Sequence, residues 1–451
     1  MLLNRIRKIL EIPLVKNTAK LSSSNIFVML LPLAVTPILS RIYTPADYGD
    51  WGVFVSVFYT IQSFLFLSYE NTIVKTNRET ELPGLIIICL IVALSVISLT
   101  YIAFKLGGLF EIQFFKDFPD LSLLIALLLI IMTCTILKSL CNKNRQYGTM
   151  AISGVIDGTA QAGIRIFLGL VPIVASGLIV GNVLAQLLTA LYLIFVLRKY
   201  LWTLDFRKIN FSFIIKLAQK YQKFPIYDAP AKLVEIGMGS LPIIILSYFW
   251  ERSQLGCYSM VITFLLMPIS LIGSAMGNVY YKELSENQDS LQIMRNSTVK
   301  VAKISFWLSF LPMMFLALGG DKLLVLFLGT KWLDAGKMSL CLSLYSLPVI
   351  MSEPLLPIFR IMDKQEIRLR LNVANFVIAM ASLMLVPIMS KNIFHTLIIF
   401  SVIQMSFRFY LFKKELSLLS LSPSILKNFI LITSVCYIIV LSRILGERLI
   451  L

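Results

Sequence analysis

Along this chain, apolar segments as long as whole helices alternate with short polar segments. Apolar runs of about 20 residues, long enough for an α-helix to cross a bilayer, are separated by short segments with charges and turn residues. The pattern predicts an all-α integral membrane protein. Twelve such runs and a thirteenth that closes the chain lie at 21–41, 49–70, 83–104, 120–140, 150–172, 176–197, 225–249, 255–281, 300–320, 338–359, 369–390, 393–412 and 425–445.

The composition supports a membrane protein with many spans. Of the 451 residues, 58% are hydrophobic and only 14% are charged, against about a quarter charged in ordinary soluble proteins. Mean hydropathy is +0.84 over the whole chain, so the apolar excess is not confined to one anchor. No small-residue cleavage pattern follows the first apolar run, and we therefore expect a retained first helix.

The positive charges favour one orientation in the membrane. The formal net charge is +17, and if the N-terminus is cytoplasmic, most of the 41 Lys and Arg residues fall in cytoplasmic segments. This distribution follows the positive-inside rule, which the opposite orientation would violate. The basic residues thus predict a multi-pass topology with a cytoplasmic N-terminus. Because they lie in short loops, they do not predict a nucleic-acid partner.

Residues for metal, disulfide or nucleotide chemistry are sparse. The six cysteines are scattered without a close CxxC pair, the single histidine is His395, and no HExxH or GxxxxGK[ST] motif occurs. The sequence therefore predicts no metal site, no disulfide framework, no ATP-driven pump and no cofactor.

The longest polar interval, 198–224, lies midway along the chain. Its Lys216, Lys220 and Lys223 share one face of a helix that also carries apolar residues. This predicts an interfacial amphipathic helix beside anionic lipid headgroups, although a basic inter-domain linker explains it equally well. The predicted domains are an N-terminal six-helix lobe (1–197), this linker (198–224), a C-terminal six-helix lobe (225–412), and a cytoplasmic loop with an extra C-terminal helix (413–451).

The two halves carry traces of an internal repeat. Without gaps, Ile38-Leu39-Ser40 aligns with Ile245-Leu246-Ser247, and Gly49 aligns with Gly256. Because each half has an even number of predicted helices, the repeats are parallel. We therefore expect two six-helix lobes around a central cavity, the usual place for a transporter's substrate.

Four motifs carry a resemblance to a known family. They are Leu39–Gly49 (LSRIYTPADYG), Tyr69–Val74 (YENTIV), Leu255–Ser259 (LGCYS) and Leu326–Trp332 (LFLGTKW). Together they resemble landmarks of the Wzx-type O-antigen and polysaccharide flippases, in the multidrug/oligosaccharidyl-lipid/polysaccharide exporter superfamily. The thirteenth apolar run departs from the twelve-helix pattern of that family, so the side of the C-terminus is open.

The resemblance implies a function. It implies a flippase, not an enzyme, in the bacterial inner membrane that moves undecaprenyl-pyrophosphate-linked oligosaccharide repeat units from the cytoplasmic to the periplasmic leaflet. The internal repeat adds the hypothesis of ion-coupled alternating access, in which the two lobes rock about the cavity. Membrane lipids, and polymerase and chain-length proteins of the same pathway, are the implied partners. The motifs do not separate O-antigen flippases from exopolysaccharide or teichuronic acid relatives.

Charges inside membrane helices are costly, so each one is a candidate for a polar cavity. Asp228, Lys232 and Glu235 share one face of the run 225–249, which is rich in Pro and Gly. Our hypothesis is that Lys232 contacts the pyrophosphate and that Glu235 or Asp228 holds the lysine in place or exchanges a proton. The alternative is a structural ion pair at the cytoplasmic end.

Arg165 is the second candidate for the phosphate. It lies four residues after Gln161 in the run 150–172, and the guanidinium fork of arginine suits phosphate oxygens. A bond from Arg165 to a helix-end carbonyl or to Asp157 is the alternative.

The other candidates are acids and polar groups. Glu353, in the proline-rich run 338–359, and Arg360, directly after it, share one helix face. A buried Glu353 could couple transport to a proton or sodium gradient. Pairing of Glu353 with another helix is the alternative. Glu70 is a candidate by the family resemblance only. Asn25 could contact sugar, or could bond to a neighbouring helix.

Two other classes of function are open. A membrane-embedded polysaccharide polymerase or ligase has similar size and composition, but it needs a large outward loop, and the predicted loops around 105–119 and 321–337 are too short to fold separately. A multidrug-type small-molecule antiporter would share the two-lobe fold and differ in its cavity. The two in-membrane cations favour an anionic substrate.

Overall fold

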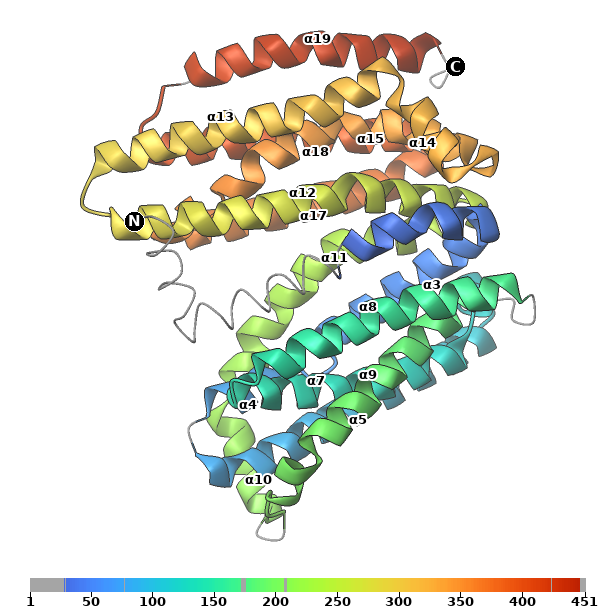
Figure 1. Ribbon diagram of the computed structural model, residues 1–451, viewed down its shortest axis with the longest axis vertical. Coiled ribbons are helices and arrows are strands. Elements are labelled where there is room, and N and C mark those ends of the chain that lie inside the picture. Colours follow the sequence, from blue (N-terminus) through green and yellow to red (C-terminus); the bar gives the residue numbers. More distant parts are fainter. Residues whose placement is uncertain are drawn as a thin grey trace, which may run out of the picture. The chain divides into compact units, whose positions relative to one another are not determined.

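The computed structural model describes residues 28, 30–76, 78–171, 176–206, 209–422 and 424–446. Helices account for nearly all of these residues, and none of them forms a strand (Figure 1). Within these ranges, eight helices are long and apolar enough to cross a membrane. The predicted all-α membrane architecture is confirmed. Asn25 lies outside the described residues.

The chain forms two compact units, Met1–Ile244 and Ile245–Leu451. The division comes later in the chain than the predicted linker 198–224, so the residues just after the linker group with the first unit. The second unit begins at Ile245, which aligns with Ile38 in the predicted repeat. The predicted domain boundaries otherwise stay a prediction.

The helices of the first unit follow the predicted apolar runs. Besides the short helix Leu30–Ile42, they are α3 (Pro45–Phe64), α4 (Glu70–Lys75), α5 (Leu82–Leu109), α6 (Gln113–Lys116), α7 (Leu121–Lys143), α8 (Tyr147–Leu170), α9 (Gly177–Trp202), α10 (Phe211–Lys220) and α11 (Ala229–Leu246).

The predicted single helix over 49–70 is wrong, because the chain divides there into α3 and α4. At the start of α3, Thr44 and Asp47 form a capping box, in which the Thr44 backbone N–H donates to the Asp47 carboxylate at 2.7 Å. After α3, Leu67 and Ser68 adopt φ values of 47° and 64°. This left-handed conformation cannot continue a right-handed helix. The turn makes Glu70 the first residue of α4.

The predicted amphipathic helix is α10, and one of its faces packs against α5. Leu217 is buried and, with Phe213, contacts α5 at Gly84. Lys220 donates to the buried Glu81 carboxylate at 2.6 and 2.8 Å. Lys220 therefore forms an ion pair with a buried acid, whereas contact of this helix with lipid headgroups stays a prediction. Phe211 lies on the exposed side of α10.

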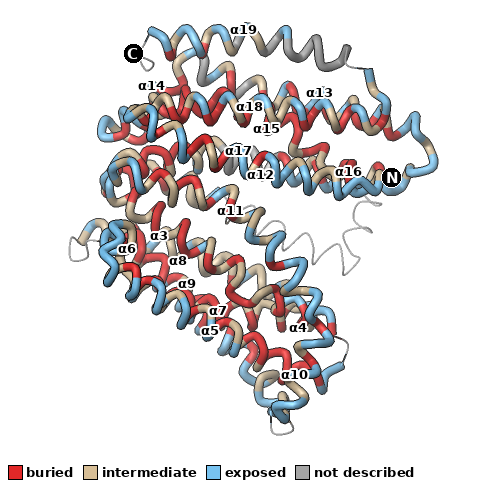
Figure 2. Tube along the Cα trace, turned by 180° about the vertical axis from the view of Figure 1, so that it is seen from behind, coloured by how far each residue is buried: buried red, intermediate tan, exposed pale blue. Residues whose placement is uncertain are grey.

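The second unit is built around one buried helix. Its helices are α12 (Arg252–Glu286), α13 (Leu291–Phe315), α14 (Asp321–Leu328), α15 (Leu333–Ser352), α16 (Ile358–Ile361), α17 (Gln365–Met389), α18 (Ile393–Leu418) and α19 (Ser424–Gly446). Nearly every residue of α15 from Ala335 to Ser352 is buried, because α12, α13 and α18 pack around it (Figure 2). The predicted extra C-terminal helix is α19.

Proline-rich segments break two helices where the sequence predicts bends. A short π-helical segment, Phe224–Asp228, precedes α11, with Pro225 at its start. A 3-10 turn, Glu353–Leu355, follows α15, which itself contains Pro348. Proline removes a backbone donor and clashes with the preceding turn, so regular helix is interrupted there.

Candidate functional site

Arg165 is a buried arginine in the middle of the first unit. Its side chain leaves α8 beside Gly181 of α9, where an added Cβ atom would lie 2.6 Å from the Arg165 Cγ atom. Its Nε donates to the Leu178 carbonyl oxygen at 3.2 Å, and its guanidinium carbon lies 4.1 Å from the centre of the Trp51 ring. A planar guanidinium commonly stacks on an aromatic face in this way.

The guanidinium of Arg165 keeps an unused donor. Only 9% of the residue is exposed, and its Nη2 atom has no hydrogen-bond partner in the described ranges. No carboxylate there forms an ion pair with it either. Of the two alternatives expected from the sequence, the bond to a helix-end carbonyl is present, since Leu178 lies at the start of α9. A bond to Asp157 is not observed among the described residues, and the Asp157 carboxylate accepts from Gln186 at 2.9 Å. A buried positive charge with a free donor is a position where an anion would be stabilised.

Arg165 is the last of three polar residues of α8 that form hydrogen bonds to α9. Four residues earlier on α8, Gln161 donates to the Asn182 side-chain oxygen at 2.6 Å, and the Asp157–Gln186 bond follows at the same interval. The spacing of four keeps all three α8 residues on one helix face. Gln161, which the sequence also offers as a candidate polar residue of the cavity, is engaged in helix–helix bonding.

Lys232 of α11 pairs with Glu70 of α4. About a third of the Lys232 side chain is exposed, whereas Glu70 is largely buried, and the second carboxylate oxygen of Glu70 has no partner in the described part of the chain. Neither Asp228 nor Glu235 pairs with Lys232 there, and both are exposed. The partner that we had predicted from the spacing along the helix is thus wrong. The actual partner lies in the motif YENTIV.

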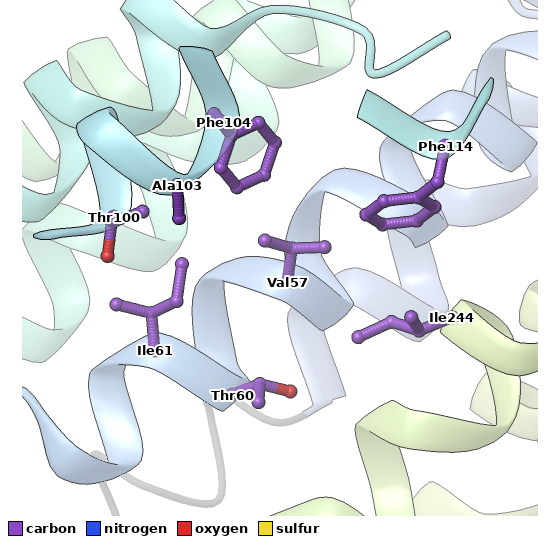
Figure 3. A pocket seen from close by; sticks show the side chains of 8 residues that line it. All are labelled: Val57, Thr60, Ile61, Thr100, Ala103, Phe104, Phe114 and Ile244. Atoms are coloured by element: carbon purple, nitrogen blue, oxygen red, sulfur yellow. The ribbon is translucent and has the colours of Figure 1, made fainter. Parts of the chain in front are cut away.

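An apolar pocket of about 260 Å³ lies in the same unit. Figure 3 shows Val57 of α3, Phe104 of α5, Phe114 of α6 and Ile244 of α11 around it. The lining also contains Thr60, whose hydroxyl bonds to Ser240 and to the Ser56 carbonyl. The pocket thus suits an apolar group.

The acid that we had predicted in the second unit, Glu353, is paired. Its carboxylate accepts from Nη1 of Arg408 on α18 at 3.0 Å, and it packs against Gly273 of α12, where an added Cβ atom would lie 2.9 Å from the Glu353 Cγ atom. This is the alternative that the sequence had left open. Arg360 is exposed. The structure does not bring Glu353 and Arg360 together.

One buried acid escaped the sequence analysis. Glu415 of α18 is fully buried, and neither of its carboxylate oxygens has a hydrogen-bond partner among the described residues. The neighbouring Lys413 and Lys414 made this segment look like a polar loop after the last apolar run. Only the extension of α18 to Leu418 shows that Glu415 belongs to a packed helix.

Metal-ligand clusters are not found in the described ranges, where no group of three His, Cys, Asp or Glu residues could hold a metal ion. Cys89, Cys134, Cys141, Cys257 and Cys341 are buried and form no disulfide among the described residues. Arg165, the Lys232–Glu70 pair and the apolar pocket are three separate candidate features of the first unit.

Comparison with family models identifies this kind of protein. The model described as "Polysaccharide biosynthesis protein" matches residues 38–337, which is more than half of the chain. The chain belongs to this polysaccharide biosynthesis family. A comparison with curated proteins finds no match.

Several solved membrane transporters have a similar fold. The lipid II flippase MurJ in an inward closed conformation superposes with a TM-score of 0.66 at 13% identity, covering 96% of this chain and 99% of that chain. An inward-facing multidrug resistance MATE family transporter of the MOP superfamily gives a TM-score of 0.65 at 12% identity, covering 88% and 96%. A MOP superfamily transporter from Pyrococcus furiosus gives 0.51 at 13% identity, covering 90% and 96%. At these identities the likeness shows a shared fold.

Proposed function

We propose that this protein is a flippase that moves a polyprenyl-pyrophosphate-linked oligosaccharide, such as an undecaprenyl-linked O-antigen repeat unit, from the cytoplasmic to the periplasmic leaflet of a bacterial inner membrane. It acts by ion-coupled alternating access, with its N-terminus in the cytoplasm, and without catalysis. The membership of a polysaccharide biosynthesis family and the transporter fold support this proposal. Polymerase and chain-length proteins are its proposed partners.

One observation carries the proposal: Arg165 is a buried cation with a free donor. Burying a charge without a counter-charge is costly, and the cost is accepted where the charge serves a function. A pyrophosphate oxygen that accepts from Nη2 would supply the missing partner. In this proposal the Nε bond to Leu178 and the stacking on Trp51 hold the guanidinium in place, so that only Nη2 faces the substrate.

Lys232 is the second cation of the proposed site. Its ion pair with Glu70 neutralises it while no substrate is present, and its partial exposure leaves the ammonium group accessible. A pyrophosphate that reaches Lys232 would compete with Glu70 for the same charge. Asp228 and Glu235 have no role in this account.

The experiment measures lipid-linked oligosaccharide on each membrane face in cells that carry Arg165→Gln, Lys232→Ala or wild type. Sugar that a lectin reaches in intact spheroplasts is compared with the total after lysis, and protein amounts in the membrane are matched. Arg198→Gln is the control, because Arg198 is an exposed arginine near the end of α9. We expect accumulation on the cytoplasmic face for the first two variants and wild-type export for the control. Normal export by both Arg165→Gln and Lys232→Ala would contradict the proposal.

A small-molecule antiporter is the second candidate function. The apolar pocket lined by Phe104 and Phe114 favours it, because such a lining suits an aromatic drug cation. Efflux of a fluorescent drug cation by wild type, lost in Phe104→Ala and kept in Arg165→Gln, would favour the antiporter over the flippase.

A further inference from the structure

Glu415 occupies an unusual position in the second unit. It lies near the end of α18, none of its surface is exposed, and both of its carboxylate oxygens are without a hydrogen-bond donor in the part of the chain that the structure describes. Buried polar groups in proteins are normally bonded, and an ionised carboxylate without a donor is among the costliest groups to bury. A neutral carboxylic acid avoids most of that cost.

The groups around Glu415 are already engaged with one another. The charged groups that act on it are Arg408 of the same helix, Glu353 after α15 and Arg368 of α17. Arg408 donates through Nη1 to Glu353 at 3.0 Å. From α12, Tyr280 faces Glu415, but its hydroxyl bonds to Thr298 at 2.6 Å.

Glu283, an acid that acts on Tyr280, is also hydrogen-bonded. Glu283 of α12 accepts a hydrogen bond from Ser297 and acts electrostatically on Tyr280. A second donor of Arg408, Nε, is buried without a partner in the described residues. Arg408 precedes Glu415 by seven residues, which places the two on one face of α18. Of the two carboxylates that interact electrostatically with Arg408, Glu353 is the one hydrogen-bonded to it in the described residues.

We propose that Glu415 is a proton-binding site of the second unit. In the described conformation it is a neutral carboxylic acid. When a rearrangement admits water, the O–H proton passes to water, and the resulting carboxylate attracts Arg408 through the free Nε. That attraction competes with the ion pair to Glu353, so loss of the proton changes the contact between α18 and the end of α15.

This inference rests on the proposed function in one respect: it makes the proton the coupling ion of the flippase. It also assigns the coupling role to Glu415. Glu353, the acid that we had expected from the sequence to couple transport to an ion gradient, instead holds Arg408. A cation held by Glu415 is the competing occupant, and the experiment distinguishes the two.

The experiment is infrared spectroscopy of the purified full-length protein in detergent at neutral pH. We expect a carbonyl band of a protonated carboxylic acid in wild type that shifts on exchange into D₂O. The band should be lost in Glu415→Gln and kept in Glu366→Gln, which alters an exposed acid of α17. Glu415→Asp should restore a band at a shifted position, which also covers the case in which Glu415→Gln fails to fold. Added Na⁺ should leave the band unchanged.

Absence of the band in wild type, its persistence in Glu415→Gln, or its removal by Na⁺ would overturn the inference. Because the spectrum needs no substrate, its result is independent of the proposed function. A band that behaves as expected in a protein that does not move lipid-linked sugar would retain the proton site and reject the flippase.

Discussion

Lys232 of α11 and Glu70 of α4 form an ion pair within the first unit, although they are far apart in the sequence. Both residues are at least partly shielded from water, so each reduces the cost of burying the other. The helix α11 continues from the first unit into the start of the second. The ion pair attaches this helix to α4 within the first unit.

The ion pair predicts non-additive effects of mutation. Glu70→Gln or Lys232→Met alone should each lower the free energy of unfolding by about 1–3 kcal/mol, since each leaves a charge without its partner. The double variant should lose less than the sum of the two, as for residues in direct contact. Thermal unfolding in detergent measures this. Strictly additive losses would show that the pair does not form.

The contact between Gly181 and Arg165 predicts a steric effect. Gly181→Ala should lower stability by about 1–3 kcal/mol, because the new methyl group would displace the Arg165 side chain. Gly163→Ala on α8 is the matched control, since nothing lies within 4 Å of its added Cβ atom. Alanine favours a helix over glycine by up to about 1 kcal/mol, so the control should be neutral or stabilising. Equal thermal midpoints for the two variants would contradict the packing.

The pair of Lys220 and Glu81 predicts a dependence on pH. The hydrogen bond to Glu81 raises the pKa of the Lys220 ammonium group. A raised pKa in the folded state means that the stabilisation is present at neutral pH and is lost as the pH rises through that pKa. The thermal midpoint of wild type should therefore exceed that of Lys220→Met at neutral pH, and the gap should close in alkaline buffer. Lys216→Met is the control, because Lys216 is exposed on the same helix. A gap that is constant with pH would contradict this.

The C-terminal helix is held by Arg443. Its guanidinium contacts the buried Asp321 carboxylate of α14 at 2.8 Å, and Tyr437 donates to the Leu344 carbonyl of α15 at 3.0 Å. Arg443→Gln should lower stability by about 2–4 kcal/mol, because it leaves a buried acid unpaired. Protease sensitivity of the segment that joins α18 and α19 should rise. Unchanged stability and cleavage would show that α19 does not depend on this pair.

The sequence predicts the helices well and their partners poorly. The described parts of the apolar runs are mostly helical, because a segment in hydrocarbon must satisfy its own backbone hydrogen bonds. Prolines mark the breaks near Phe224–Asp228 and Glu353–Leu355. The turn at Leu67 and Ser68 was missed because neither residue favours it.

Partners of charged side chains depend on how helices meet, which spacing along one helix cannot show. Spacing suggested Asp228 or Glu235 for Lys232, whereas the structure supplies Glu70 from another helix. Arg165 was identified because a charge in an apolar run is conspicuous in any context. Glu415 was missed because it follows two lysines, and its burial results from packing by α15 and α17.

The most direct test of the central claim is flipping by purified protein. A fluorescent polyprenyl-pyrophosphate-linked sugar is placed in proteoliposomes, and the fraction that a membrane-impermeant quencher reaches is followed with time, with and without an imposed ion gradient. We predict rapid loss of protection with wild type and with Arg198→Gln, and slow loss with Arg165→Gln and with protein-free vesicles. Equal rates for wild type and Arg165→Gln, or transport of a fluorescent drug cation without movement of the lipid-linked sugar, would contradict the account.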